Sequence, residues 1–270
     1  MRISLLGPVT VTHDGLEIRL NGRHQRALVA VLASEPGKVM PTDRLIDALW
    51  GDGPPATART KLQGCISGLR KQLTVSKPTG MKGQWPLRTR DPGYLLCADE
   101  VAVDLSDYRT LLQCAARDMD AGRFSAASAR LDAALALWRG PAYADARTRV
   151  ISAMAAALES GRLLAIRRKA ECDLMIGRYD AVTDELGLAL AAHPLHEGMR
   201  ATLMLALYRV NCRAEALEAY RVGHALLREQ LGIEPGPVLR RLHELILHAD
   251  PRLATSGAVA ELYEAPGVAG

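Results

Sequence analysis

Hydrophobic and polar positions change their spacing after the first hundred residues of the chain. Near the start, short runs such as RISLLG, VTV and LEIRL alternate apolar with polar residues between Gly, Pro or Asp, which predicts a small antiparallel sheet. From position 103 onward, apolar residues recur at three- and four-residue spacing, which predicts helices. We therefore expect a mainly α protein with an α+β domain over residues 1–98, an all-α domain over 99–250 and a flexible tail over 251–270.

Three helices and a hairpin are predicted in the first domain. The first helix is expected over residues 23–34, and the second over DRLIDALW, with Thr42 as its cap and Asp43 in its first turn, where the helix dipole favours an anion. The third is expected over residues 56–73. The segment WPLRTRDPGYLLCA then predicts two short strands about a turn at residues 91–93. Strands, three helices and a terminal hairpin in this order predict a winged helix-turn-helix, whose last helix enters the major groove of DNA.

The third helix has two unlike faces. At about 100° per residue, its apolar side chains point in one direction and its small, polar and basic ones in the opposite direction. A solvated helix normally mixes charges of both signs on its exposed face, whereas this one has no acidic residue. Such a face can approach a polyanion closely. The residues expected to point inward are Ala58, Leu62, Cys65, Ile66, Leu69 and Leu73.

The positive charge of the chain is concentrated in its first part. The net charge is +4, but residues 1–100 carry +5 and the remainder carries −1. Residues 53–90 contain eight basic residues and no acidic one, so a nucleic acid is the expected partner. A solvated face without a partner is the ordinary explanation for one Lys or Arg, and a weaker one for eight with no acid among them. These eight are Arg59, Lys61, Arg70, Lys71, Lys77, Lys82, Arg88 and Arg90.

Similar phrases recur in the second domain: AGRFSAASARLDAALALWRG, IGRYDAVTDELGLALAAHP and NCRAEALEAYRVGHALL. The offset from Arg178 to Arg213 is 35 residues, close to the period of tetratricopeptide helix hairpins. The offset from Arg123 to Arg178 is 55, so we expect an additional helical segment there. Stacked hairpins with small residues between them predict a tetratricopeptide-like domain.

Patterns of catalytic or metal sites are absent from the sequence. There is no phosphate-binding loop, nucleophile elbow or C-x-x-C pair, and the His193/His196 and His243/His248 pairs lack a third ligand at useful spacing. The five scattered cysteines are expected to be buried thiols. We therefore expect no enzyme activity, no cofactor and no metal. With no signal peptide and no long apolar run, we expect the cytoplasm and no membrane contact.

The chain resembles the Streptomyces antibiotic regulatory protein family of bacterial transcriptional activators, from about Arg2 to Asp250. The motifs that carry the resemblance are LLGPVTV, DRLIDALWGDGPPATARTKLQGCISGLRKQL, GYLL, VDLSDYRTLL, ALALWRGPAY and EQLGIEPGPVLRRLHELIL. The resemblance implies an OmpR-type winged helix over 1–98 and a bacterial transcriptional activation domain over 99–250.

The resemblance also implies a function and a set of contacts. Its members bind direct repeats overlapping the −35 promoter element, side by side as homodimers, and recruit RNA polymerase holoenzyme through sigma factor region 4 and other subunits. They switch on secondary-metabolite genes, including those for antibiotics, so the protein would associate with the nucleoid. The residues implied to lie nearest the bases are Thr60, Lys61, Gln63, Gly64 and Ser67. Those implied to contact phosphates or the minor groove are Arg59, Arg70, Lys71, Lys77, Arg88 and Arg90.

A second hypothesis is an adaptor protein. In it, the tetratricopeptide-like domain binds a peptide or small ligand, while the basic domain contacts RNA or an acidic protein. The basic face lacks aromatic side chains on which unpaired bases could stack, which counts against single-stranded RNA. Competition between duplex and single-stranded nucleic acid distinguishes the two hypotheses.

Overall fold

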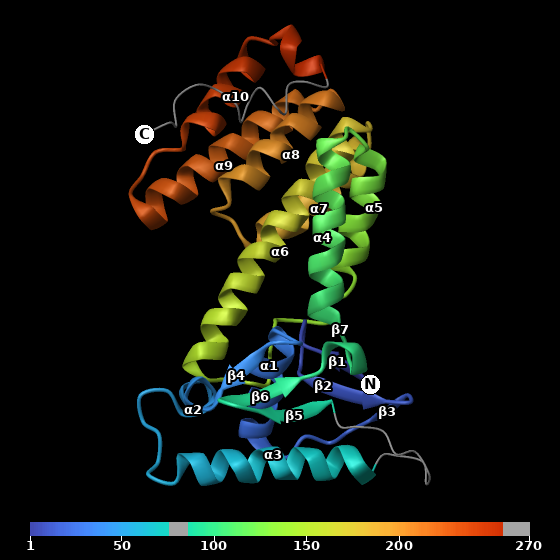
Figure 1. Ribbon diagram of the computed structural model, residues 1–270. Coiled ribbons are helices and arrows are strands. Elements are labelled where there is room, and N and C mark those ends of the chain that lie inside the picture. The colour runs from blue at the N-terminus through green and yellow to red at the C-terminus, as the bar shows by residue number, and fades with distance from the viewer. Residues whose placement is uncertain (76–85, 256–270) are drawn as a thin grey trace. The chain divides into compact units, whose positions relative to one another are not determined.

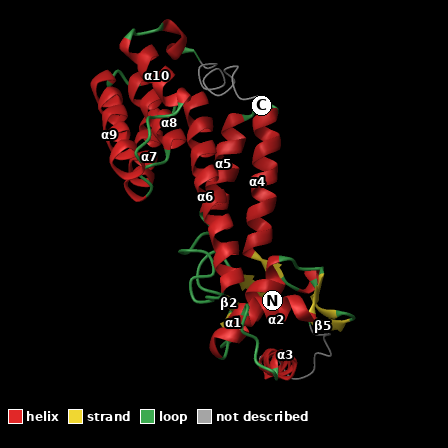
Figure 2. Ribbon diagram, turned by 90° about the vertical axis from the view of Figure 1, so that its left-hand side faces the viewer, coloured by secondary structure: helices red, strands yellow, loops and turns green. Residues whose placement is uncertain are grey.

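The computed structural model describes residues 1–75 and 86–255, without the side chains of residues 73–75. Internal contacts divide the chain into two compact units: residues 1–113 with 133–162, and residues 114–132 with the chain from 163 onward. These units do not coincide with the expected domains, because residues 99–113 and 133–162 group with the first unit. Within the described part of the chain, strands occur only in the first unit; Figure 2 shows these strands in yellow.

A small sheet begins the first unit. The strands β1 (Arg2–Ser4), β2 (Thr10–His13) and β3 (Leu16–Glu17) pair antiparallel, as the alternating pattern predicts. A further strand, β7 (Ala102–Val103), pairs parallel with β1 and completes the order β3-β2-β1-β7. The sequence did not indicate β7, because two residues are too few to show an alternating pattern.

The wing is a second sheet, made of β4 (Val39–Pro41), β5 (Leu87–Arg90) and β6 (Gly93–Leu96) in the order β4-β6-β5. The predicted hairpin is present, but Gly93 already pairs within β6 and so does not belong to the turn. A Cβ atom at Gly93 would lie 1.9 Å from the carbonyl oxygen of Met40 on the neighbouring strand. Only glycine therefore permits β4 and β6 to approach this closely.

The first unit contains three helices in its first 75 residues: α1 (Gly22–Ser34), α2 (Thr42–Trp50) and α3 (Ala58–Val75). All three were predicted from the hydrophobic pattern, although α3 begins and ends two residues later than the predicted 56–73. The helices pack on one another, and α3 lies next to β5 in Figure 1. Strands, three helices and a hairpin in this order form the expected winged helix-turn-helix.

The predicted cap of α2 is wrong. Thr42 is the first residue of the helix, and the N-cap position is held by Pro41 without any side-chain cap hydrogen bond. The Thr42 hydroxyl instead donates to the carbonyl oxygen of Pro92, 3.0 Å away, and its backbone N–H donates to the same oxygen. Thr42 therefore links the start of α2 to the turn of the wing.

The ALALWRGPAY segment packs against the start of the chain, although the sequence pattern placed it in the helical domain. The backbone N–H of Arg139 donates to the carbonyl oxygen of Leu6 (2.7 Å), and that of Tyr143 donates to the carbonyl oxygen of Leu5 (3.0 Å). The buried carboxylate of Asp104 accepts the N–H groups of Leu5 and Leu6 in turn. These long-range hydrogen bonds explain why residues 133–162 belong to the first unit.

The helical part of the chain confirms the predicted fold class of a mainly α protein. In the second unit, α8 contacts α7, α9 and α10, as expected of stacked helix hairpins. The division between the units falls within α4, α5 and α6. The helices are α4 (Asp104–Asp120), α5 (Phe124–Leu135), α6 (Arg149–Met175), α7 (Tyr179–Ala192), α8 (Glu197–Arg209), α9 (Arg213–Leu231) and α10 (Pro237–Leu247).

The repeated turns of the sequence end α4, α6 and α8 in a common way. Gly122, Gly177 and Asn211 each adopt a left-handed conformation, with φ of 71°, 80° and 64°. Glycine and asparagine are the residues that tolerate this conformation at a helix C-terminus. In the first turn, the guanidinium of Arg123 also lies 2.6 Å from the carboxylate of Asp118. In this first repeat, the Arg that follows the turn therefore forms an ion pair with the end of the preceding helix.

The predicted flexible tail, residues 251–270, begins with an ordered turn. Pro251–Ala254 form a short 3-10 helix in which Leu253 is buried. Arg209 of α8 donates hydrogen bonds to the carbonyl oxygens of Leu253 and Thr255, at 3.2 and 2.6 Å. The remainder of the predicted tail lies outside the described residues. None of the helices in the described part of the chain has the length and apolar character needed to cross a bilayer.

Candidate nucleic-acid interface

The inner face of α3 anchors it to the first unit. The predicted inward residues are buried with α1 and α2 in one hydrophobic core, except that Cys65 is half-buried and the side chain of Leu73 is not described. Burying one such Leu or Ile side chain contributes about 1.5–3 kcal/mol, so the rotation of α3 about its axis is strongly fixed. At Gly68 the backbone passes so close to α1 that a Cβ would lie 3.0 Å from Nε2 of Gln25. The buried residues are Ala58, Leu62, Ile66 and Leu69.

The outer face of α3 is exposed along its length. Positions 60, 64, 67 and 71 follow one another at helical spacing, so they form one row on the surface. At Gly64 there is no atom within 4 Å of the place where a Cβ would be, so the backbone there is open to a ligand. All five residues predicted to lie nearest the bases are exposed, as is Lys71. These five are Thr60, Lys61, Gln63, Gly64 and Ser67.

Two cations of the acid-free span are paired with acids from outside it. Nη2 of Arg59 lies 2.8 Å from Oδ1 of Asp43 on α2, in a pair whose side chains are 73% and 77% exposed. An exposed pair of this kind contributes about 0–1 kcal/mol, so an approaching phosphate can compete for Arg59. Arg88 of β5 forms an ion pair with Glu100 of η1 (Ala98–Glu100), and both side chains are about two-thirds buried. The expectation of a span without counter-charge is therefore only partly correct.

Arg70 links α3 to the wing. Its Nε donates to the carbonyl oxygen of Leu87 (3.1 Å), and its Nη2 donates to the hydroxyl of Thr89 (3.0 Å). Both acceptors belong to β5, and Leu87 is buried. In this structure Arg70 therefore fastens the wing to α3, a role different from the predicted contact with phosphate. The sequence could not indicate this, because the two acceptors lie 17 and 19 residues away along the chain.

Three predicted cations remain exposed without an ion pair among the described residues: Lys61 and Lys71 on α3, and Arg90 at the end of β5. The predicted contacts Lys77 and Lys82 lie outside the described residues. The geometry thus presents one cation near each end of α3 and one on the wing. A polyanion that follows this surface can contact all three without breaking an internal ion pair.

A cation that sequence reasoning missed lies near Lys61. Arg23, in the first turn of α1, is exposed. The pKa of the adjacent His24 is lowered by burial and by the positive charges of Arg23 and Lys61, so all three groups share one region. His24 also packs against Trp50, with ring centroids 5.1 Å apart. A single Arg at the start of an amphipathic helix gave no signal in the sequence.

The residues considered as metal ligands have structural contacts. Nδ1 of His196 accepts the N–H of Met199 at 3.2 Å and so caps α8. His243 stacks on Tyr220, with ring centroids 3.9 Å apart and ring planes 9° apart. Among the described residues, no group of three His, Cys, Asp or Glu side chains could hold a metal ion. Burial raises the pKa of Cys172 to about 12, which keeps that thiol protonated.

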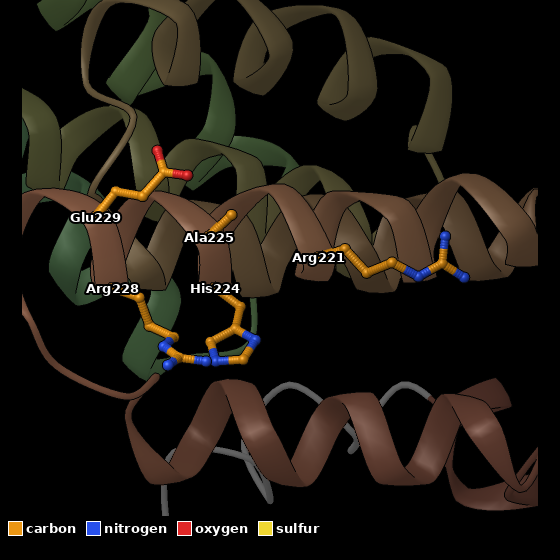
Figure 3. A pocket seen from close by; sticks show the side chains of 5 residues that line it. All are labelled: Arg221, His224, Ala225, Arg228 and Glu229. Carbon is orange, nitrogen blue, oxygen red and sulfur yellow. The ribbon is translucent and has the colours of Figure 1, made fainter.

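A shallow groove on α9 bears on the adaptor hypothesis (Figure 3). Its volume is about 520 Å³, and its lining residues all come from α9. Two of its side chains already face Glu234: Nε2 of His224 lies 2.8 Å from Oε2, and Nε of the Arg228 guanidinium lies 3.7 Å from Oε1. Arg221 pairs with Glu218 on the same helix. The groove therefore offers an acidic peptide few unpaired cations.

Comparison with protein families identifies two regions of the chain. A family described as bacterial transcriptional activator domain matches residues 103–247, and one described as transcriptional regulatory protein, C terminal, matches residues 15–96. Together they cover the helical part of the chain and most of the winged helix-turn-helix.

Individual relatives match over nearly the entire chain. It is 36% identical to the regulatory protein DnrI of Streptomyces peucetius over 95% of this chain and 96% of DnrI. It is also 36% identical to the regulatory protein AfsR of Streptomyces coelicolor over 97% of this chain, which is 26% of AfsR. The transcriptional regulatory protein EmbR of Mycobacterium tuberculosis is 36% identical over 94% of this chain and 65% of EmbR. The chain thus spans the length of DnrI but only parts of the two longer relatives.

A solved structure has the same fold. The structure of Mycobacterium tuberculosis EmbR in complex with a low-affinity phosphopeptide matches with a TM-score of 0.88 at 35% sequence identity. The match covers 97% of this chain and 69% of the EmbR chain. The combination of a winged helix-turn-helix with stacked helices is therefore shared with an experimentally determined protein.

Proposed function

Because the chain belongs to the Streptomyces antibiotic regulatory protein family of transcriptional activators, we propose that it binds promoter DNA through α3 and activates transcription of the adjacent genes. The observation that carries the proposal is the outer face of α3, which is exposed, free of acidic residues and accompanied by Lys61, Lys71 and Arg90, three cations with no ion pair among the residues that the structure describes. Its inner face is buried, so the outer residues have a fixed orientation toward a ligand. Such a helix fits the major groove of duplex DNA.

Specificity and general affinity are assigned to different residues. Gln63, Thr60 and Lys61 can reach base edges, and each well-placed bidentate contact discriminates by about 1–3 kcal/mol. Lys71 and Arg90 supply contacts to phosphates, which carry no sequence information. Arg59 also contacts a phosphate, after giving up its exposed ion pair with Asp43.

The helical part is proposed to contact RNA polymerase. Two copies would bind side by side on direct repeats overlapping the −35 promoter element and recruit the holoenzyme through sigma factor region 4 and other subunits. The target genes would belong to secondary metabolism. Support comes from the activator-domain match over residues 103–247 and from relatives named as regulatory proteins.

A titration with labelled promoter DNA tests the DNA-binding part. The purified protein should bind a duplex fragment from upstream of its own gene cluster more tightly than the same sequence as a single strand. Removing one phosphate contact lowers the salt slope of binding by about 0.9 and, in 0.1 M salt, the affinity about eightfold. Lys71→Ala should show both changes. Gln63→Ala should instead alter the ranking of duplexes that differ by one base pair.

Lys38→Ala is the matched control, because Lys38 is also exposed but pairs with Glu35 at 3.2 Å and lies outside α3. It should leave the salt slope unchanged. Equal affinity for duplex and single strand would favour the adaptor hypothesis. If the protein binds the duplex but does not increase transcript yield by holoenzyme from that template, the activator part of the proposal is wrong.

A further inference from the structure

A cavity of about 450 Å³ lies within the first unit. Its lining comes from the C-terminal end of α1, from β4 and α2, from the segment between α5 and α6, and from the parts of α4 and α6 that belong to the same unit. Cavities that bind small molecules typically measure about 300–1000 Å³ and combine apolar walls with a few polar groups. This cavity has that size and that composition.

The walls of the cavity are largely aliphatic. Val31 and Met40 are buried in the core of the winged helix-turn-helix, and Met154 and Leu158 of α6 are half-buried. Two of these four side chains are methionines, which adapt their shape to different ligands. An apolar molecular body therefore fits this part of the cavity.

Tyr143 provides a polar group under backbone strain. The residue is 2% exposed, lines the cavity and has a positive φ of 52°, which is unusual for a bulky side chain. Residues held in such conformations cluster at binding sites, where the surrounding structure over-determines them. Burial raises the pKa of Tyr143 to about 12, so its hydroxyl keeps the proton that it can donate to an acceptor.

Two arginines give the cavity a cationic side. Arg109 lies near Tyr143 and uses Nη1 for a hydrogen bond to the carbonyl oxygen of Ser34, 2.7 Å away. Arg44 on α2 is exposed and forms no ion pair within the described part of the chain. Of the two acids that line the cavity, Glu35 pairs with Lys38, which leaves the Asp47 carboxylate to oppose two guanidinium groups.

We propose that this cavity binds a small amphipathic anion, with a carboxylate or sulfonate head group on Arg44, Arg109 and Tyr143 and an apolar body against Met40, Met154 and Leu158. The occupant would contact α1 and α2, both of which pack on α3. This ligand site goes beyond DNA binding, because none of its lining residues belongs to α3 or the β5–β6 hairpin.

Fluorescence titration of the full chain with 8-anilinonaphthalene-1-sulfonate tests the site, because this probe joins a sulfonate to an apolar aromatic body. Saturable binding of one probe per chain is expected. Ala157→Trp, which places a bulky ring at a lining position of α6, should weaken binding at least tenfold. Ala156→Trp is the matched control, since Ala156 is an exposed neighbour on the same helix that does not line the cavity.

Arginine variants test the head-group contact. Arg109→Gln should weaken binding of the sulfonate several-fold but leave binding of the neutral dye Nile red unchanged, and Arg44→Gln serves the same purpose if loss of the Ser34 contact unfolds the chain. Equal effects of the two tryptophan substitutions, or equal losses for both dyes, would overturn the proposal. Duplex DNA binding by Ala157→Trp is expected to persist, so failure of the cavity leaves the proposed function intact.

Discussion

Arg70 and Lys71 are adjacent cations on α3 with different contacts, since Arg70 is bonded to β5 whereas Lys71 is exposed, and substituting each separately tests whether their roles differ. Arg70→Met removes two hydrogen bonds to β5, at 3.1 and 3.0 Å, while keeping an apolar stem of similar length. Lys71→Met removes an exposed charge that has no ion pair among the described residues. The two variants lose the same formal charge and should nevertheless differ in stability and in DNA binding.

The cost of Arg70→Met follows from its two acceptors. Hydrogen bonds with a charged partner contribute about 1.5–3 kcal/mol each when buried. Arg70 is half-buried, so partial screening by solvent reduces the combined loss to about 1–2 kcal/mol. The carbonyl of the buried Leu87 would also lose a donor. The melting temperature should therefore fall by roughly 3–6 °C, and the amides of β5 and β6 should exchange faster with solvent.

Measurements of DNA binding should also distinguish the two variants. Lys71→Met should keep the melting temperature and lower the salt slope by about 0.9. Arg70→Met should lower the melting temperature and also weaken DNA binding, because a displaced wing moves the phosphate contact proposed for Arg90; any fall in its salt slope should therefore accompany a fall in melting temperature. Arg70→Lys should resemble Arg70→Met, since it keeps the charge and loses the two-pronged geometry. A lowered salt slope with an unchanged melting temperature in Arg70→Met would show that Arg70 contacts phosphate after all.

Two further predictions concern stability. Gly93→Ala should lower the free energy of unfolding by about 3 kcal/mol or more, because the new Cβ collides with the carbonyl group of Met40. Gly64→Ala should instead stabilise α3 by about 0.5–1 kcal/mol, because the space around this position is open. Chemical denaturation measures both changes. Hydrogen bonds from Arg123 and Arg130 lower the pKa of Asp118 in the folded state. The ionised carboxylate therefore stabilises the folded state fully above the pKa of an unfolded Asp, about 4, and this stabilisation is lost as the pH falls through the lower pKa of the folded state. Asp118→Asn should therefore lower the free energy of unfolding at neutral pH and make it fall less steeply as the pH is lowered. If the free energy of unfolding fell equally steeply in acid for both proteins, this assignment would be wrong.

Helical periodicity was sufficient to predict the faces of α3, because the pattern is local. Leu62 and Ile66 are buried and Gln63 and Ser67 are exposed, as the spacing along one helix requires. The stacked helix hairpins followed from the same kind of pattern. The short strands β4 and β7 and the packing of ALALWRGPAY on the start of the chain were not predictable, because each depends on a partner far away in the sequence.

Counting charges along the sequence located the basic surface but could not show which cations are free. The acid-free span suggested that all its bases are available, yet Arg88 pairs with Glu100 and Arg70 holds the wing. Whether a cation can reach a phosphate depends on the strength of its internal contact. The exposed pair of Arg59 can be exchanged at little cost, whereas releasing the more buried Arg88 would leave Glu100 without its partner. We therefore expect non-specific affinity to come mainly from Lys71 and Arg90, with Arg59 in addition, and the assignment of base contacts to α3 stays a prediction.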